Sequence, residues 1–296
     1  MNRTFLIIVH YSDPQITLDC LDSIYKNGRN LSTIVINNSS EKLPDRINSY
    51  SHLYIINSPK NLGYASANNL GIRMALKKNA RSVILLNNDT LLSNQSLPGF
   101  ISYAQKSDKI GILSPKIYFA KGYEFHKTRY RKKDLGKVIW YAGGQIDWQG
   151  VYPKHRGVDK VDQGQYDRSI QTDFATGCCM LIKEKVISKI GFLDENYFLY
   201  FEDVDYSLRA VSAGFQVIYY PHYYLWHKNA GSSSGPGSSV HQYYQTRNRL
   251  YFGFKYAGIR TKAALFRESL KDLFSTGLKR KAVLDYYFEK MGKGSL

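Results

Sequence analysis

The stretch SVILLNND, residues 82–89, decides the fold, because it joins a buried strand to a polar end. Its first part is a continuous apolar run of strand length, which is typical of a parallel strand covered on both faces. Its last three residues, Asn87, Asn88 and Asp89, are polar. Ligands of open parallel sheets bind beyond the carboxyl ends of the strands. The stretch therefore predicts a central strand with a binding site at its tip.

The rest of the first 90 residues repeats this pattern. Apolar runs predict further strands at 4–9, 32–36 and 53–56. Helical patterns lie between strands, one capped by Asp13-Pro14 and ended by Gly28, the other at 64–78. The strands are followed by polar residues, namely His10 and Tyr11, Asn37 and Asn38, and Asn57 and Ser58. This alternation predicts an α/β fold with a mostly parallel, doubly wound sheet, and the polar strand ends predict one shared site.

The alternation changes after residue 110. We expect strands at 117–119, at 174–182 with an interruption at Gly177, and at 216–220 with an end at Pro221. We expect helices at 203–213, stopped by Gly214, and at 240–257. Loops are predicted at 121–137, which is basic and exposed, at 150–170, and at the Ser/Gly-rich segment 231–237, which the composition marks as flexible.

Composition narrows the function classes. The chain has 296 residues with 43% hydrophobic and 22% charged residues, which is typical of a globular protein. No apolar run approaches the roughly 20 residues that cross a bilayer, and no secretory signal precedes the first strand, so we expect a cytoplasmic protein. Three cysteines form no disulfide framework or zinc site and are expected to be buried thiols.

The net charge of +17 implies an anionic partner: nucleic acid, a membrane surface or a phosphate-bearing substrate. No DNA- or RNA-binding motif accompanies the charge, so nucleic acid is not the expected partner. Residues 241–296 hold twelve Lys and Arg against four Asp and Glu. Their basic residues are interleaved with Phe266, Leu270, Leu273, Phe274 and Leu278. This pattern suits a helix lying on the inner face of an anionic membrane, and a solvated helix packed on the main domain is the alternative.

One acidic residue and one acidic cluster could carry chemistry. Asp89 at a strand tip could hold a divalent cation that bridges a diphosphate, although it could equally cap a turn. Glu202, Asp203 and Asp205 stand at a helix start, where the positive helix end favours ionised acids and a general base. Arg209, four residues beyond Asp205, is expected to pair with it. Alternatively, these acids only cap the N-terminus of the helix and have no catalytic role.

Two further features are weaker signals. His227 could ligate the metal or contact phosphate, and a purely structural role is the alternative. The segment from Asn61 to Asn68 contains Gly63 and opens a helix, so its free N–H groups could bind an anion. An ordinary transition from loop to helix would look the same.

Together these residues resemble a known family. The matching segments, in order, are IIVHYSDP (7–14), IVINNSS (34–40), NLGYASANNLGI (61–72), ILLNNDT (84–90), the stretch 175–215 that contains ATGCCMLI and YFEDVDYSLR, and YYQTRNRLYF (243–252). The chain resembles the inverting glycosyltransferases of family 2, and especially their bacterial rhamnosyltransferase-like branch. The resemblance implies the GT-A fold, a Rossmann-like, mostly parallel sheet flanked by helices, here with a C-terminal helical extension.

The resemblance also implies a domain plan. Residues 1–230 would form the catalytic domain, with a donor-binding half at about 1–110 and an acceptor half at about 111–230. Residues 231–296 would add the Ser/Gly loop and the basic amphipathic helices.

Roles follow from the same resemblance. Asp203 matches the catalytic base, Asp89 the retained acid of an Asp-x-Asp metal motif, and His227 a further metal ligand. The donor-binding residues would be His10, Tyr11, Asn37, Asn38, Asn61, Gly63, Asn68, Asn87, Asn88 and Asp89. The acceptor or sugar pocket would contain Ala175, Thr176, Gly177, Glu202 and Arg247, with the arginine at the mouth of the site. Asn37 and Asn38 replace the acidic residue that the family usually places against the base.

The implied reaction moves a sugar from a nucleoside diphosphate donor to a hydroxyl of a glycan or lipid-linked acceptor in cell-surface glycan synthesis, with Mg²⁺ or Mn²⁺ as cofactor. The donor would be a dTDP- or UDP-sugar, with dTDP-rhamnose among the candidates. A sugar nucleotidyltransferase and a non-catalytic nucleotide-sugar or glycan-binding protein are the alternatives. A glycosidase would need two carboxylates facing each other across the sugar and would leave the polar strand ends unexplained. The oligomeric state stays open.

Overall fold

The computed structural model describes residues 3–26, 31–94, 97–126, 128–229 and 237–296. Its strands are β1 (Thr4–His10), β2 (Ser32–Asn37), β3 (Leu53–Asn57), β4 (Ser82–Asn87), β5 (Thr90–Leu92), β6 (Ile110–Phe119), β7 (Ile139–Tyr141), β8 (Gly144–Asp147), β9 (Tyr152–His155), β10 (Ile170–Gln171), β11 (Cys179–Lys183) and β12 (Gln216–His227). Its α-helices are α1 (Pro14–Tyr25), α2 (Gly63–Lys77), α3 (Leu97–Ala104), α4 (Glu184–Ile190), α5 (Glu202–Ser212), α6 (Ser239–Tyr256), α7 (Ile259–Leu273) and α8 (Leu278–Tyr287).

The main sheet has the order β10-β12-β6-β11-β4-β1-β2-β3. The expected strands of the first 90 residues, β1, β2, β3 and β4, pair in parallel, and β6 and β12 form a second parallel pair. Between the two groups, β11 runs antiparallel to β4 and β6. The sheet is therefore mixed and mostly parallel, which confirms the predicted α/β class.

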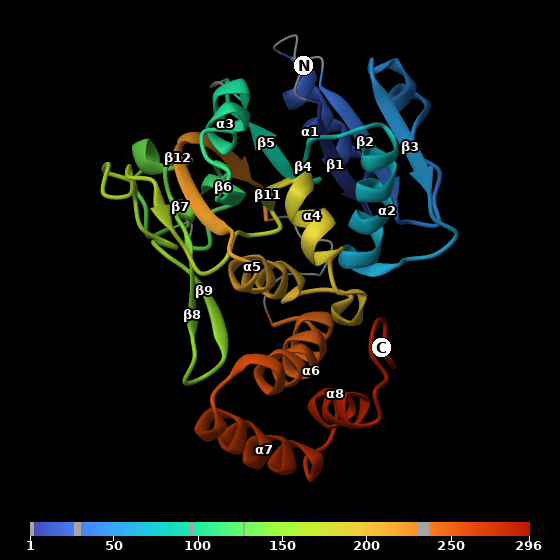
Figure 1. Cartoon of the computed structure of the whole chain (residues 1–296), viewed down its shortest axis with the longest axis vertical. Helices are drawn as coiled ribbons and strands as arrows, with labels where there is room; N and C mark the ends of the chain where they lie inside the picture. Colours follow the sequence, from blue (N-terminus) through green and yellow to red (C-terminus); the bar gives the residue numbers. More distant parts are fainter. Residues whose placement is uncertain (1–2, 27–30, 95–96, 127, 230–236) are drawn as a thin grey trace.

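Alternate side chains of the central strands build two cores, one on each face of the sheet. Leu6, Ile8 and Val35 face the core that also holds residues of α1 and α3. Phe5 and Ile7 face the opposite core, which α2, α4 and α5 cover. Figure 1 shows these helices on the two sides of the sheet. The continuous apolar runs thus reflect strands that are buried on both faces.

The first helix is capped as predicted, because the Asp13 side chain accepts a hydrogen bond from the Gln15 N–H at 2.9 Å and Pro14 is its first residue. Gly28, the expected end of that helix, lies outside the described residues, as does most of the Ser/Gly-rich segment 231–237. The three cysteines are free and buried, as expected.

Four predictions about the second half of the chain are wrong in their bounds, three of which concern the segments before β12. The strand expected at 117–119 starts at Ile110, and the strand expected at 174–182 starts only at Cys179. The preceding Gly177 donates its N–H to the Asp203 carboxylate at 2.8 Å rather than to a neighbouring strand. The loop expected at 150–170 contains β9, which pairs with β8 in a hairpin, and β10.

The strand expected to end at Pro221 continues to His227. β12 shifts register against β6 between Tyr220 and Tyr224, and pairing then resumes up to His227 opposite Phe119. A proline has no N–H to donate, so it is accommodated at this irregularity instead of ending the strand.

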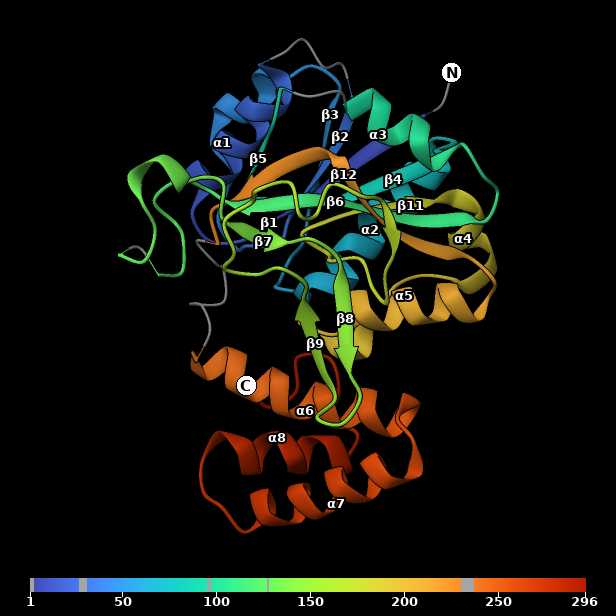
Figure 2. The same ribbon diagram turned by 90° about the vertical axis from the view of Figure 1, so that its left-hand side faces the viewer.

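The C-terminal helices α6, α7 and α8 form a layer at the far side of α5 from the sheet (Figure 1). The β8–β9 hairpin reaches from the sheet to this layer (Figure 2). At its tip the Trp148 ring stacks on Phe252, and the Gly150 carbonyl accepts a hydrogen bond from Arg249 Nε at 2.7 Å. None of the helices in the described ranges is both long and apolar enough to cross a bilayer.

Candidate active site

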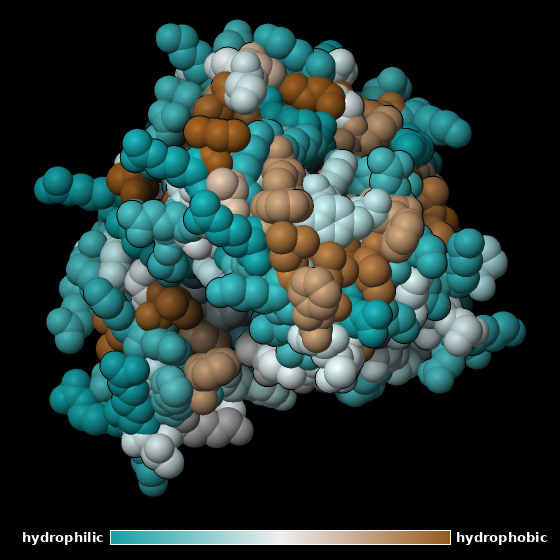
Figure 3. Space-filling view, turned by 90° about the horizontal axis from the view of Figure 1, so that it is seen from below, coloured by the Kyte–Doolittle hydropathy of each residue, from teal (hydrophilic) through white to brown (hydrophobic). Residues whose placement is uncertain are grey.

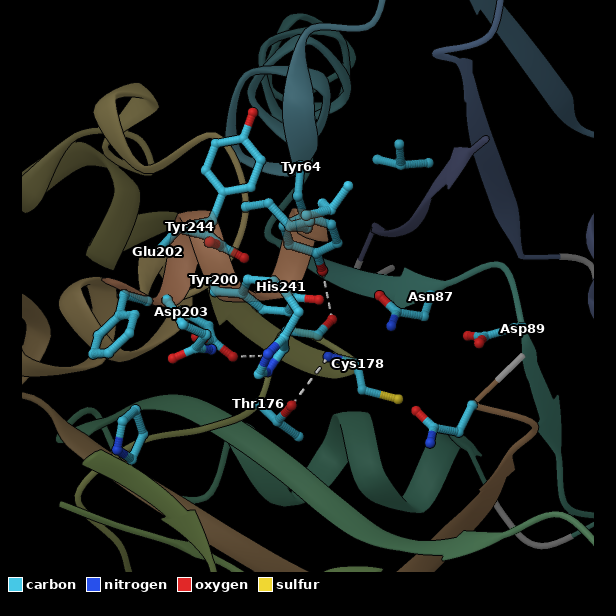
Figure 4. A pocket seen from close by; sticks show the side chains of 18 of the residues that line it. Tyr64, Asn87, Asp89, Thr176, Cys178, Tyr200, Glu202, Asp203, His241 and Tyr244 are labelled. Atoms are coloured by element: carbon cyan, nitrogen blue, oxygen red, sulfur yellow. Dashed lines mark hydrogen bonds between the residues drawn. The ribbon is translucent and has the colours of Figure 1, made fainter. Parts of the chain in front are cut away.

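A cavity of about 820 Å³ lies at the carboxyl ends of β1 and β4, beneath the turn that precedes α5 and the first turns of α6. Asp89 and Asp203 both line it. In the close-up of Figure 4, Asp89 and Asn87 lie toward one end, Glu202 and Asp203 lie toward the other, and Cys178 lies between them. The strand ends and the acidic turn therefore share one site.

Most of the site residues predicted from the sequence line the wall of this cavity. The structure brings together Tyr11, Asn38, Asn61, Gly63, Asn87, Asn88, Asp89, Thr176, Gly177, Glu202, Asp203 and His227. Five predicted residues do not line the cavity, namely His10, Asn37, Asn68, Ala175 and Arg247.

Four of these five lie just behind the wall. His10 Nδ1 lies 2.7 Å from the Thr17 hydroxyl, and Asn68 donates to the Tyr64 carbonyl at 2.9 Å. Asn37 donates to the Glu41 carbonyl at 2.8 Å, and Ala175 is buried in the core. His10 and Asn37 end β1 and β2, and because side chains alternate along a strand, a polar residue at a strand end can point away from the site.

Asn38 and Asn61 hold the start of α2. The Asn38 side chain donates to Asn61 Oδ1 at 2.9 Å and accepts from the Leu62 N–H at 2.8 Å, while Asn61 Oδ1 also accepts from the Gly63 N–H at 2.9 Å. Gly63 has φ +79°, and a Cβ there would lie 2.5 Å from the Phe198 carbonyl oxygen. Only glycine fits this approach of the α2 start to the turn before α5.

Asp89 and His227 form a close pair at the other end of the cavity. Asp89 lies in the turn between β4 and β5, and β5 pairs with β12 so that Thr90 is opposite His227. This pairing places His227 Nε2 2.9 Å from Asp89 Oδ1, with both side chains buried. The extension of β12 beyond Pro221 is what delivers the histidine to the carboxylate.

This pair fits a divalent cation. A carboxylate oxygen and an imidazole nitrogen are both metal ligands, and buried His227 Nδ1 has no hydrogen-bond partner. No group of three or more His, Cys, Asp or Glu residues in the described part of the chain could hold a metal by itself. Substrate phosphates commonly complete the coordination of Mg²⁺ that has only one or two carboxylate ligands. The residues present therefore suit a cation that is held jointly with a phosphate-bearing ligand.

Asp203 is a buried carboxylate held by backbone N–H groups. Its Oδ2 accepts from Gly177 at 2.8 Å, and its Oδ1 accepts from Val204 at 2.8 Å. The carbonyl of Gly177 in turn accepts a hydrogen bond from the Tyr64 hydroxyl at 2.5 Å. Gly177 is therefore held through both its N–H, by Asp203, and its carbonyl, by Tyr64 (Figure 4).

Glu202 and Asp203 are not kept fully ionised by the helix start, contrary to the expectation. Burial raises the pKa of Glu202 well above its usual range, and the nearby Asp203 raises it further. Burial also raises the pKa of Asp203, but the N–H groups of Gly177 and Val204 oppose that rise. Glu202 Oε2 is buried without a hydrogen-bond partner. The proton of the pair therefore belongs on Glu202, and Asp203 carries the negative charge.

Glu202→Gln is expected to stabilise the protein at neutral pH. A carboxyl group whose pKa is higher in the folded state contributes stability at low pH and loses it as the pH rises through that pKa. Glutamine mimics the protonated form and removes this loss. Thermal denaturation across pH 4–9 checks the prediction: the gain in Tm should grow with pH, and an equal Tm difference at every pH would contradict it.

The turn before α5 is strained. Phe198, Tyr200 and Phe201 have φ values of +57°, +70° and +73°, a region that side-chain-bearing residues seldom adopt. Fully buried Asn248 on α6 donates to the carbonyls of Tyr197, Leu199 and Tyr200 at 2.8 to 3.0 Å. Such bonds hold in place the turn that presents Glu202 and Asp203 to the cavity.

Arg247 is part of the same brace and is not at the mouth of the site, which corrects the sequence-based expectation. It is fully buried, and its guanidinium donates to the carbonyls of Asn196, Tyr197 and Lys290 at 3.1 to 3.3 Å. The predicted ion pair between Asp205 and Arg209 on α5 is confirmed at 2.8 Å.

Several wall residues were not singled out from the sequence. The wall of the cavity also includes Trp140, His155, Tyr200, His241 and Tyr244. The Trp140 ring meets His155 and His227 edge-on, with centroids 4.3 Å and 4.5 Å away. Burial lowers the pKa of His155 to about 4, so it is neutral and donates from Nδ1 to the Trp140 carbonyl at 3.1 Å. His155 is an isolated histidine in a polar stretch, so no sequence pattern marked it as a site residue. Tyr200 could have been found, because it lies next to the acidic cluster at 202–205.

Several curated proteins are similar in sequence to parts of this chain. A low-salt glycan biosynthesis hexosyltransferase, Agl10 of Haloferax volcanii, is 29% identical over 60% of this chain, and the chain spans about half of that relative's length, 52%. The dTDP-rhamnosyl transferase RfbF of Shigella flexneri is 23% identical over 83% of this chain and 78% of its own. An N-acetylglucosaminyl-diphospho-decaprenol L-rhamnosyltransferase of Mycobacterium tuberculosis is 24% identical over 67% and 66%.

Solved structures share the fold. GalNAc-T7 with UDP, GalNAc and Mn²⁺ superposes with a TM-score of 0.66 at 15% identity, over 96% of this chain and 54% of its own. A mannosyltransferase of Pyrobaculum calidifontis, in complex with GDP-Man and Mn²⁺, gives 0.55 at 13% identity, over 99% and 76%. Both are glycosyltransferases, and the present fold is of the GT-A type.

The family model described as glycosyltransferase like family 2 matches residues 2–253, which is most of the chain. The matched range contains the strand ends, the acidic turn and the buried brace on α6. The protein therefore belongs to glycosyltransferase family 2.

Proposed function

We propose that this glycosyltransferase moves a sugar from a nucleoside diphosphate donor to a hydroxyl of a glycan or lipid-linked acceptor, with inversion at the anomeric carbon. One observation carries the proposal. The buried carboxylate Asp203 and the Asp89–His227 pair line the same cavity of about 820 Å³, which is large enough for a nucleotide sugar. The named rhamnosyltransferase relatives support dTDP-rhamnose or another dTDP- or UDP-sugar as donor.

The donor would occupy the end of the cavity formed by the strand tips. Tyr11, Asn38 and Asn61 would contact the nucleoside, because they line the wall beyond β1 and β2. Asp89 and His227 would hold Mg²⁺ or Mn²⁺, which would offset the negative charge of the diphosphate leaving group. The structural neighbours solved with Mn²⁺ support a divalent cation in general.

The acceptor would enter from the side of α6 and the aromatic wall. Its hydroxyl oxygen would bond to the anomeric carbon as the bond between that carbon and the diphosphate oxygen breaks. Asp203 would take the hydroxyl proton, and the electron pair of the broken bond would leave with the diphosphate. A single displacement of this kind inverts the anomeric centre. Trp140, Tyr200 and Tyr244 line the cavity and would contact the acceptor sugar.

A thermal-shift screen of nucleotide sugars with Mg²⁺ or Mn²⁺ tests this function. A ligand at 100 times its Kd stabilises the folded state by about 2.7 kcal/mol, so the matching donor should raise Tm by several degrees. We expect a selective rise for one dTDP- or UDP-sugar, dependent on the metal. If no nucleotide sugar raised Tm with either ion, the proposed donor class would be wrong.

A further inference from the structure

The outer face of α7 carries an apolar stripe that no other part of the described chain covers. Ile259, Phe266, Leu270 and the C-cap residue Phe274 are spaced by seven, four and four residues, so they lie on one face of the helix. Their exposed fractions are 81%, 47%, 38% and 90%. Figure 3 looks onto this end of the molecule and shows apolar side chains gathered among hydrophilic ones. Such a patch marks an interaction site.

Cations border this stripe. Arg260, Arg267 and Lys271 follow it on one side of the helix, and Lys262 lies on the other, as the helical period requires. The acidic residues Glu268 and Asp272 fall on the opposite side of α7, and Glu268 is paired with Arg249 at 2.8 Å. The helix therefore presents apolar and positive groups together, and its negative groups face elsewhere.

We propose that this stripe and its bordering cations bind an anionic membrane surface, with α7 lying in the plane of the lipid headgroups. An apolar face flanked by Lys and Arg is the pattern of helices that insert shallowly into anionic bilayers. A protein partner would need a complementary acidic and apolar surface, whereas an anionic bilayer supplies both kinds of contact over its whole area. The charge complementarity therefore favours lipid over a second copy of this basic chain.

The rest of the molecule holds α7 in a fixed position for this contact. On its inner face Leu265 packs against Gly253 of α6, where a Cβ would lie 2.3 Å from the leucine. Leu273, which the sequence analysis placed among the apolar residues facing the membrane, packs partly against the core and is therefore not part of the exposed stripe.

Helix α6 connects the lipid-binding stripe of α7 to the cavity. α6 packs on α7 and α8, and its residues Val240, His241, Tyr244 and Gln245 line the cavity. Docking α7 on a bilayer would therefore bring the acceptor side of the cavity near the lipid surface. This last consequence rests on the proposed function, whereas lipid binding itself does not.

Sedimentation with vesicles tests the proposal. We expect the full chain to pellet with phosphatidylcholine vesicles that contain phosphatidylglycerol, to stay in solution with pure phosphatidylcholine, and to be released by high salt. Each Lys or Arg near an anionic surface increases the affinity for the membrane by a factor of about five. The double variant Arg267→Gln with Lys271→Gln should therefore bind about 20-fold more weakly. Phe266→Ser with Phe274→Ser should weaken it tenfold or more.

The matched control is Lys132→Gln with Lys133→Gln, which removes the same charge from exposed positions between β6 and β7. It should bind vesicles nearly as well as the wild type. All substituted side chains are exposed, so an unchanged Tm verifies that each variant folds. Equal binding of the α7 variants and the wild type, or no binding to anionic vesicles, would overturn the proposal.

Two further measurements separate this inference from its competitors. Asp203→Asn should pellet like the wild type, so that a failure of the proposed catalysis leaves lipid binding intact. Light scattering without vesicles should show no self-association that depends on the α7 stripe. A dimer abolished by Phe266→Ser with Phe274→Ser, together with no vesicle binding, would assign the stripe to a second copy instead.

Discussion

Asp203→Asn is expected to lower the rate of sugar transfer by about 10²–10⁴-fold, the range over which a positioned general base acts. The side chain keeps its size, and its Oδ atom can still accept a hydrogen bond from the Gly177 or Val204 N–H. It can no longer take a proton from the acceptor hydroxyl. Nucleotide-sugar affinity should change little, because the strand tips that would bind the nucleoside lie toward the other end of the cavity.

Glu202→Gln is the matched control for this experiment. It removes the neighbouring carboxyl group, but that group is already protonated because burial raises its pKa well above the usual range. Transfer should therefore survive in Glu202→Gln and fail in Asp203→Asn. Equal loss in both variants, or full activity of Asp203→Asn, would remove Asp203 from the role of base.

The pH dependence of transfer gives a second readout on the same residue. Burial raises the pKa of Asp203, and a base must be deprotonated to accept a proton. The rate kcat/KM should therefore fall on the acid side as the pH drops through this raised pKa, above the usual carboxyl value of about 3.9. This acid limb should be absent from the residual activity of Asp203→Asn.

Asp89→Ala is expected to abolish the metal-dependent part of donor binding and to lower transfer by about 100-fold or more. The substitution leaves His227 as the single protein ligand of the pair, since the described residues offer no third metal-binding side chain nearby. Calorimetry with the donor nucleotide, with Mn²⁺ and with a chelator, measures the effect. The wild type should bind more tightly with Mn²⁺, and the variant should bind equally in both conditions.

Asp45→Ala serves as the control for that experiment, because it removes an exposed carboxylate that does not line the cavity. It should retain the Mn²⁺-dependent gain in affinity. His227→Ala should reproduce a smaller version of the Asp89→Ala defect. An undiminished metal effect in Asp89→Ala would show that the cation is bound elsewhere.

The fold of the first 90 residues was predictable because the pattern that specifies each of its strands is local. Continuous apolar runs at 4–9 and 82–86 indicate strands buried on both faces, and both strands appear as β1 and β4. The polar strand ends predicted a shared edge of the sheet, since parallel strands end at the same side. The pattern could not indicate which way each side chain points. His10 and Asn37 are the last residues of β1 and β2, and they do not line the cavity, whereas the next residue, Asn38, does.

The structure of the second half of the chain could not be predicted in the same way, because it depends on contacts between segments that are distant in the sequence. Pro221 suggested a strand end, but pairing of β12 with β5 and β6 carries the strand on to His227. Arg247 looked like a site residue, but three carbonyls of two other segments enclose its guanidinium. In both cases the partner lies at least 40 residues away in the chain, so no local pattern contained it.

The sequence by itself determined the α/β class, the placement of the site at the strand tips and the family to which the chain belongs, because period, spacing and motif order are properties of the chain. Only the tertiary structure decided which carboxyl group carries the charge and which face of α7 is left uncovered. Burial sets the pKa difference between Glu202 and Asp203, and packing on α6 selects the outer stripe of α7. Both depend on which atoms exclude water, and this is settled only when the whole chain has folded.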